Sequence, residues 1–214
     1  MVDEQENWRK QVFNLPENHG WTAKPGNKVF VADRGALRFE IPQDWLVEPG
    51  RKSVKFRDAE PPSDTMGLEV TVFYAGYGMR IDWSSLPLSQ LIKDVTSDDF
   101  NGRPDRASRR RKRRSDRLDQ YKSGPPLTIK MGNLEMAWVE SEFIDPGEKR
   151  PAFTRTAITR DPEASIHALL TFSYWPEDAE RAKAVWNDVM GTLKMGEHYD
   201  SPFRGPGAGG AGRK

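Results

Sequence analysis

Apolar and polar residues alternate in the first third of the chain, which is the pattern of half-buried β-strands. Leu37, Phe39 and Ile41 share one face of a predicted strand, with Arg38 and Glu40 on the other. The same two-residue period continues through residues 54–57 and 68–74. Turn-forming residues at 42–44, 48–50 and 61–64 separate these segments. The pattern therefore predicts several short strands between residues 29 and 74.

The period changes to that of a helix in two places. Leu88, Leu91, Ile92 and Val95 lie on one helical face, which predicts a helix over about 86–97. A second apolar stripe, which includes Val185, Trp186 and Val189, predicts a helix over about 176–193. Pro176 suits the first turn of that helix because it needs no N–H there.

Strand patterns return between the two helices, over residues 127–131, 134–144, 151–160 and 165–175. In the 134–144 segment the apolar residues change faces, from Leu134, Met136 and Trp138 to Val139 and Phe143. That shift indicates either a β-bulge or a strand covered on both faces. Asp145-Pro146-Gly147 and Asp161-Pro162-Glu163 predict the hairpin turns that join these strands.

The strands cluster along the chain instead of alternating with helices. This order predicts an α+β fold with an antiparallel β-sheet, covered by a middle helix and a C-terminal helix. We expect a single domain over residues 28–195, preceded by an N-terminal arm at 1–27 and followed by a disordered Gly- and Pro-rich tail at 196–214. Within this domain we expect a basic insert at 101–126, because the few apolar residues of that stretch cannot form a buried stripe.

Two segments of the chain resemble the PsbP-like superfamily, which includes the PsbP and DcrB-type domains. Residues 35–45 read GALRFEIPQDW, and residues 172–176 read FSYWP before a helix that contains Trp186. The resemblance covers about residues 28–195 and implies an α/β/α sandwich. It also implies a role in binding other proteins, and it implies no catalytic residues, because members of the superfamily share no catalytic set.

The net charge is +1, which conceals a strong separation of charge along the 214-residue chain. The stretch 103–117 holds nine basic and two acidic residues, a net +7, so the remaining residues sum to −6. Its basic side chains form one predicted binding segment: Arg103, Arg106, Arg109, Arg110, Arg111, Lys112, Arg113, Arg114 and Arg117.

Three interpretations of this basic segment stay open. It is a solvated loop, or it pairs with the acidic remainder of its own chain. It binds nucleic acid or another polyanion, in which case binding falls steeply with salt. It engages an acidic partner protein. No aromatic residues are interleaved with its arginines, which argues against stacking on single-stranded bases.

The N-terminal arm carries Trp8, Phe13 and Trp21, which are candidates for docking on a partner because aromatic residues dominate interface hot spots. The alternative, which we favour, is that the arm packs back on its own sheet, since a tryptophan buries a large apolar area.

The chain offers little for catalysis. It has no cysteine, which excludes disulfides, thiolate chemistry and cysteine-ligated metals. Its three histidines form no metal or triad motif, and His167 falls on the polar face of a predicted strand. Glu140 and Glu142 share a strand face, where exposed charges explain them more simply than an acid–base pair.

We therefore expect a protein that is not an enzyme, with no cofactor and no metal site. Its expected function is protein–protein recognition, with the basic segment engaging an acidic partner. The alternatives are nucleic-acid binding through that segment, and a carrier of a small apolar ligand or lipid in a cleft between the sheet and the terminal helix. The N-terminus lacks an apolar signal segment and no stretch could form a transmembrane helix, so we expect a cytoplasmic protein.

Overall fold

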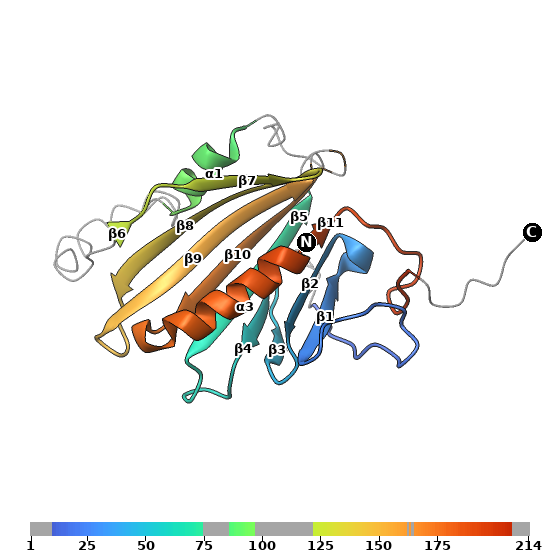
Figure 1. Cartoon of the computed structure of the whole chain (residues 1–214), viewed down its shortest axis with the longest axis horizontal. Coiled ribbons are helices and arrows are strands. Elements are labelled where there is room, and N and C mark those ends of the chain that lie inside the picture. Colours follow the sequence, from blue (N-terminus) through green and yellow to red (C-terminus); the bar gives the residue numbers. More distant parts are fainter. Residues whose placement is uncertain (1–9, 75–85, 97–121, 162, 164, 207–214) are drawn as a thin grey trace, which may run out of the picture.

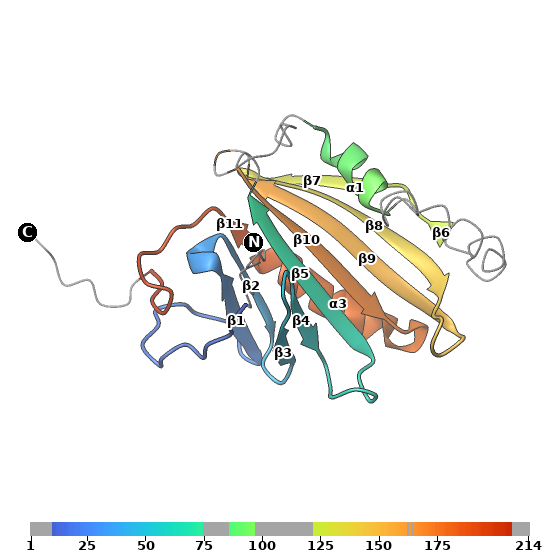
Figure 2. The same ribbon diagram turned by 180° about the vertical axis from the view of Figure 1, so that it is seen from behind.

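A computed structural model describes residues 10–74, 86–96, 122–161, 163 and 165–206 of the chain. Its strands form two antiparallel sheets, and two helices cover the larger sheet from opposite faces (Figures 1 and 2). The expected α+β class is confirmed. The arrangement differs from expectation in one respect, because the first predicted strands belong to a separate small sheet and not to the main one.

The small sheet has the order β1-β2-β11. Its strands are β1 (Asn27–Ala32), β2 (Leu37–Pro42) and the short β11 (Lys194–Met195) at the end of the domain. A 3-10 turn, η1 (Asp33–Gly35), joins β1 to β2. The end of the domain therefore lies beside its first strands, because β11 pairs with the start of β2.

The large sheet has the order β3-β4-β5-β10-β9-β8-β6, and β7 also pairs with β8. Its strands are β3 (Leu46–Pro49), β4 (Val54–Arg57), β5 (Met66–Tyr74), β6 (Lys122–Ser123), β7 (Leu127–Met131), β8 (Leu134–Ile144), β9 (Pro151–Asp161) and β10 (Ile166–Tyr174).

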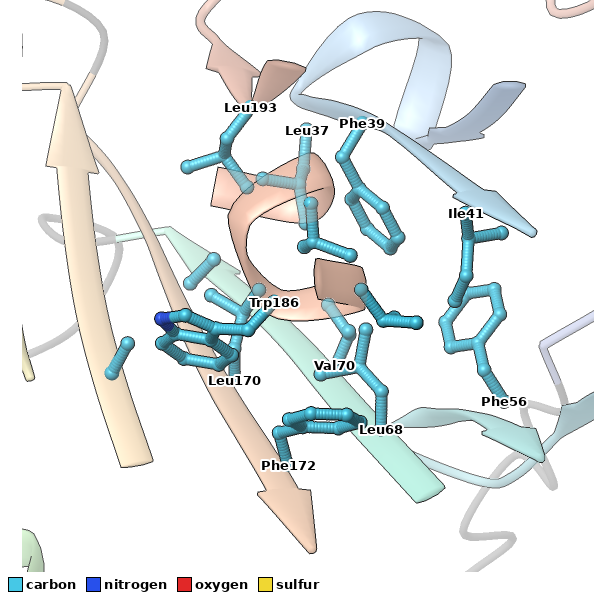
Figure 3. Close-up of a cluster of buried hydrophobic side chains, with 14 of the residues drawn as sticks. Leu37, Phe39, Ile41, Phe56, Leu68, Val70, Leu170, Phe172, Trp186 and Leu193 are labelled. Atoms are coloured by element: carbon cyan, nitrogen blue, oxygen red, sulfur yellow. The ribbon is translucent and has the colours of Figure 1, made fainter. Parts of the chain in front are cut away.

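Helix α3 (Ala179–Thr192) follows the 3-10 turn η3 (Pro176–Asp178) and lies in the angle between the two sheets. Its apolar stripe packs against β2 on one side and against β5 and β10 on the other (Figure 3). Phe172, Trp186 and Leu170 meet at the centre of this core. Alternate positions of β2 and β5 point into it, which is why the two-residue period was visible in the sequence.

Helix α1 (Leu88–Thr96) covers the opposite face of the large sheet at its β8–β9 side. Leu88, Leu91 and Ile92 pack on Ala137, Val139 and Ile158 in a second, smaller cluster. The face change predicted within 134–144 is therefore a strand covered on both faces. No bulge interrupts it, because β8 pairs with β9 residue by residue from Glu135 to Ile144.

The N-terminal arm and the residues after β11 pack on each other (Figure 1). The Gly205 N–H donates to the His19 carbonyl, and the Tyr199 N–H donates to the Arg34 carbonyl. A side chain at Gly35 would collide with Tyr199, so the close approach requires glycine there. Residues 196–206 thus differ from the expected disordered tail. Disorder stays a prediction only for 207–214, which lie outside the described residues.

Candidate functional site

The basic segment at 103–117 lies outside the described residues, as does Trp8. The roles predicted for its nine cations therefore stay predictions. This segment precedes β6 in the sequence, and the described chain resumes at Lys122, at the beginning of that strand.

The structure places the other two candidate aromatic residues of the arm differently from each other. Trp21 is buried, with its ring 5.5 Å from Tyr199 in an edge-on contact and in close contact with Gly205. Phe13 is 60% exposed, and its ring lies 5.7 Å from that of Phe203. Within the described arm, Trp21 packs on its own chain and Phe13 keeps an exposed ring.

A charged and aromatic network lies on the α3 face of the sheet, where β8, β9 and β10 pair. Arg155 Nε lies 2.5 Å from Glu140 Oε2, and the Tyr174 hydroxyl donates to the same oxygen at 2.8 Å. The Arg155 guanidinium also lies within 6 Å of the Trp138, Tyr174 and Trp186 ring centroids. The structure therefore brings Glu140 into an ion pair and leaves Glu142 out of that network.

The pKa values of Glu140 and Tyr174 are both shifted away from neutral pH. Burial would raise the pKa of Glu140, but hydrogen bonds from Arg155 and Tyr174 and the charge of Arg155 outweigh burial and hold that pKa below its ordinary value. Burial, followed by the hydrogen bond to Glu140, raises the pKa of Tyr174 to about 12. A general acid or base works best with a pKa near the operating pH. The network joins β8, β9 and β10 through the Arg155–Glu140 ion pair and the Tyr174–Glu140 hydrogen bond.

On the opposite face, Arg160 fastens the beginning of α1 to the sheet. Its guanidinium donates to Glu135 Oε2 at 2.8 Å and 2.7 Å and to the Leu86 carbonyl at 2.7 Å. His167 lies beneath the same region, buried and stacked on Phe73 at 5.3 Å. His167 shares the polar face of β10 with Thr171 and Ser173, but it is buried there.

Exposed large apolar side chains gather in two described places. One group is Val12, Phe13 and Phe203, where the arm meets the C-terminal segment. The other is the β7 row, which we define as Leu127, Ile129 and Met131, exposed by 50%, 46% and 42%. All five residues of β7 are exposed, although it is a strand of the large sheet.

The sequence analysis did not single out the β7 row. The signal was present, since Leu127-Thr128-Ile129-Lys130-Met131 alternates apolar and polar residues before a Gly132-Asn133 turn. Alternation, however, predicts a face that is buried. Only the pairing shows that β7 lies at the edge of the sheet, beyond the reach of α3.

The described residues hold no group of three His, Asp or Glu side chains that could bind a metal ion. No described helix is long and apolar enough to cross a membrane. Side chains of the main core fill the space between α3 and the large sheet, which is where a carrier would need its cleft. A groove of about 340 Å³ lies instead beside β7, lined by Pro87, Leu88 and Ser89 from the beginning of α1 together with residues of β7 and β8.

Comparison with known proteins identifies both the family and the fold. The family model Alr1449 matches residues 28–199. The protein alr1449 of Nostoc sp. (strain PCC 7120) is 35% identical over 199 residues, which is 92% of each chain.

Among solved structures, cyanobacterial PsbP (CyanoP) from Synechocystis sp. PCC 6803 is similar with a TM-score of 0.55 at 11% identity, over 83% of this chain and 98% of that one. The Ran-binding protein Mog1p of Saccharomyces cerevisiae has a TM-score of 0.46 at 11% identity, over 79% and 95%. The predicted resemblance is confirmed: the chain belongs to the Alr1449 family, and its fold is PsbP-like.

Proposed function

We propose that this chain is a non-catalytic binding module that recognises a partner protein. The observation that carries the proposal is the β7 row, three apolar side chains that stay about half exposed at the edge of the large sheet. A contiguous exposed apolar strip on a soluble scaffold is typical of an interaction surface.

The β7 row contrasts with the residues that face it across the strand pair. Ile129 pairs with Met136 and Leu127 pairs with Trp138 on β8. Met136 is buried in the main core, and Trp138 packs against Trp186 at 6.1 Å. The β7 row therefore extends the apolar face of the core to a place where no described element covers it. Burying that surface against a partner would contribute about 25 cal/mol for each Å².

The basic segment at 103–117 supports an acidic partner because its net charge is +7. It precedes β6 and β7 in the sequence. Its charge would speed the encounter with an acidic surface, and the β7 row would hold the complex once formed. Binding of nucleic acid through the same segment is the alternative function, supported by its nine cations.

Affinity capture from a native extract, followed by quantitative mass spectrometry, tests the proposal. The wild-type chain is compared with a triple variant, Leu127→Ser, Ile129→Ser and Met131→Ser. The matched control is Val12→Ser with Phe13→Ser, which removes exposed apolar side chains from the arm instead. Each capture is run with and without nuclease at physiological salt.

We expect a set of proteins that resists nuclease, is retained by the arm variant and is lost from the β7 variant. Loss in the arm variant alone would move the function to Phe13 and overturn the assignment to β7. Capture that disappears with nuclease would favour the nucleic-acid alternative.

A further inference from the structure

Strand β7 is an edge strand in the part of the large sheet that the structure describes. It pairs with β8 and with no other described strand. The two-residue Gly132-Asn133 loop joins β7 to β8, with Gly132 at φ +60° as a type II′ turn requires. In such a hairpin the residues that flank the loop, Met131 and Leu134, form a hydrogen-bonded pair.

The register then fixes which backbone groups point outward. Hydrogen-bonded and non-hydrogen-bonded pairs alternate along an antiparallel ladder. Residues 127, 129 and 131 therefore turn their N–H and C=O groups toward β8, whereas Thr128 and Lys130 turn theirs to the outer edge. These groups form the template for one more strand.

The side chains along this edge are apolar on one face and cationic on the other. The β7 row lies on the α3 face, in line with Met136 and Trp138. Thr128 and Lys130 lie on the α1 face, where the Lys130 side chain is 72% exposed. Glu135 forms a close ion pair with Arg160 at 2.7 Å, whereas Lys130 Nζ lies 3.8 Å from Glu135. The exposed Lys130 ammonium can therefore interact with an acidic ligand.

The groove between β7 and the beginning of α1 gives an added strand room for its side chains. Its walls are Pro87, Leu88 and Ser89 on one side and Thr128, Ile129 and Lys130 on the other. A volume of about 340 Å³ accommodates individual side chains of a peptide lying along β7. Strand addition has this anatomy: main-chain hydrogen bonds supply affinity, and pockets for alternate side chains supply specificity.

We propose that β7 binds an extended peptide segment of a partner protein as an additional strand of the large sheet. The segment carries apolar residues at alternate positions, which pack on the β7 row, and an acidic residue that meets Lys130. This inference rests on the proposed function and specifies how the partner is held. A second copy of the chain fits less well, because an edge of five residues is far short of the roughly 20–30 residues a side in a standard interface.

The probe that tests strand addition is an acetylated, amidated peptide of alternating glutamate and valine. Two control peptides accompany it, one with backbone N-methylation at alternate residues and one with lysine in place of glutamate. N-methylation removes the donors of the added strand and keeps its side chains. Amide NMR titration of the full chain measures affinity and location together.

We expect the glutamate–valine peptide to shift amides of β7, β8 and the beginning of α1, and the N-methylated peptide to bind about tenfold more weakly, since each main-chain hydrogen bond is worth about 1 kcal/mol. Thr128→Pro removes one outward N–H without breaking the β7–β8 ladder, and we expect a similar loss. Thr128→Val keeps that N–H and binds as wild type. Lys130→Glu reverses the preference in favour of the lysine peptide.

Equal binding of the methylated and unmethylated peptides to the wild-type chain overturns strand addition, whatever the stability of the Thr128→Pro variant. Shifts confined to amides away from β7 overturn it as well. If no peptide binds while protein capture still depends on the β7 row, the proposed function stands and the strand-addition mode is rejected. If the β7 variant captures the same proteins as the wild type, the proposed function is rejected, and strand addition is rejected with it.

Discussion

The two faces of the large sheet are built in different ways. On the α3 face, aromatic and aliphatic side chains from both sheets and the helix fill one continuous core around Phe172 and Trp186. On the α1 face, a cluster of six buried apolar residues lies beside buried hydroxyl groups of Ser141, Thr154 and Thr156. Thr154 Oγ1 has no hydrogen-bond partner among the described residues.

The two faces are therefore expected to differ in how far the effect of a substitution on stability spreads. The α3 face unites distant segments of the chain, because α3 packs on β2 and β11 then pairs with β2. The α1 face is the less completely apolar of the two, and its helix begins at the edge where β7 lies exposed. We therefore expect substitutions in the core around α3 to affect the whole fold. Substitutions in the β7 row, which lies on the same face of the sheet but beyond α3, should affect partner binding with little effect on folding.

Phe172→Ala is expected to have the largest effect on stability. Its ring is fully buried between Trp45, Tyr174 and Trp186, so truncation loses burial and leaves a cavity. The free energy of unfolding should fall by about 3–5 kcal/mol, measured by urea denaturation. Phe172→Leu, which keeps most of the volume, serves as the control. A loss below about 1 kcal/mol in the alanine variant would mean that the core is not centred here.

Ile92→Ala tests the α1 face and should act locally. Ile92 is fully buried in the small cluster, and its truncation should cost about 2–3 kcal/mol. Because α1 packs on β7, β8 and β9 at one side of the sheet, the loss should appear as faster amide hydrogen exchange in residues 86–96. Exchange in β10 should stay close to that of the wild type. Equal acceleration in α1 and β10 would show that the two faces unfold as one unit, contrary to the comparison.

Periodicity predicted the elements of both faces because alternation and helical stripes follow burial directly. Leu37, Phe39 and Ile41 were recognised as one buried face, and Leu88, Leu91 and Ile92 as another. Pairing between strands is not local, so the sequence did not indicate that β1, β2 and β11 form a separate sheet.

The remaining differences have particular causes. Gly- and Pro-rich composition resembles disorder at 196–206, where Tyr199 and Gly205 instead pack on Gly35 and Trp21. His167 alternates with apolar neighbours on the polar face of its strand, and that pattern did not reveal that its side chain is buried. The candidate site was missed for the opposite reason, since the apolar side chains of β7 look like core residues in sequence and lie exposed in the fold.

Glu140→Gln should weaken the α3 face by about 1.5 kcal/mol, because a hydrogen-bonded ion pair becomes a neutral contact. The lowered pKa of Glu140 gives the sign of its pH dependence: its contribution is complete above the ordinary carboxyl range and is lost as the pH falls through the lowered value. The wild type should therefore lose stability on acidification more steeply than the variant. Glu142→Gln, two residues along β8, removes a carboxylate that lies outside the ion pair and serves as the control.

Tyr174→Phe removes the second hydrogen bond to Glu140 and should cost about 1 kcal/mol. The raised pKa of Tyr174 means that its contribution is complete below the ordinary tyrosine pKa and is lost as the pH rises toward about 12. Stability of the wild type should fall more steeply than that of the variant over this alkaline range, measured by thermal unfolding against pH. Parallel curves would show that the hydroxyl does not interact with Glu140 in solution.

Ile129→Thr should have the smallest effect on folding, although it changes an apolar residue of a sheet strand. The side chain is already about half exposed, and threonine keeps the β-branched shape that strands favour, so the free energy of unfolding should change by less than about 0.5 kcal/mol. Met136→Thr changes the residue directly opposite on β8, which is buried in the main core, and should cost about 2 kcal/mol or more. If the two variants lose equal stability in urea denaturation, the β7 row belongs to the folding core and has no surface to offer a partner. If only Met136→Thr destabilises the chain, stability does not require an apolar residue at position 129, and recognition is the physical reason that remains for it.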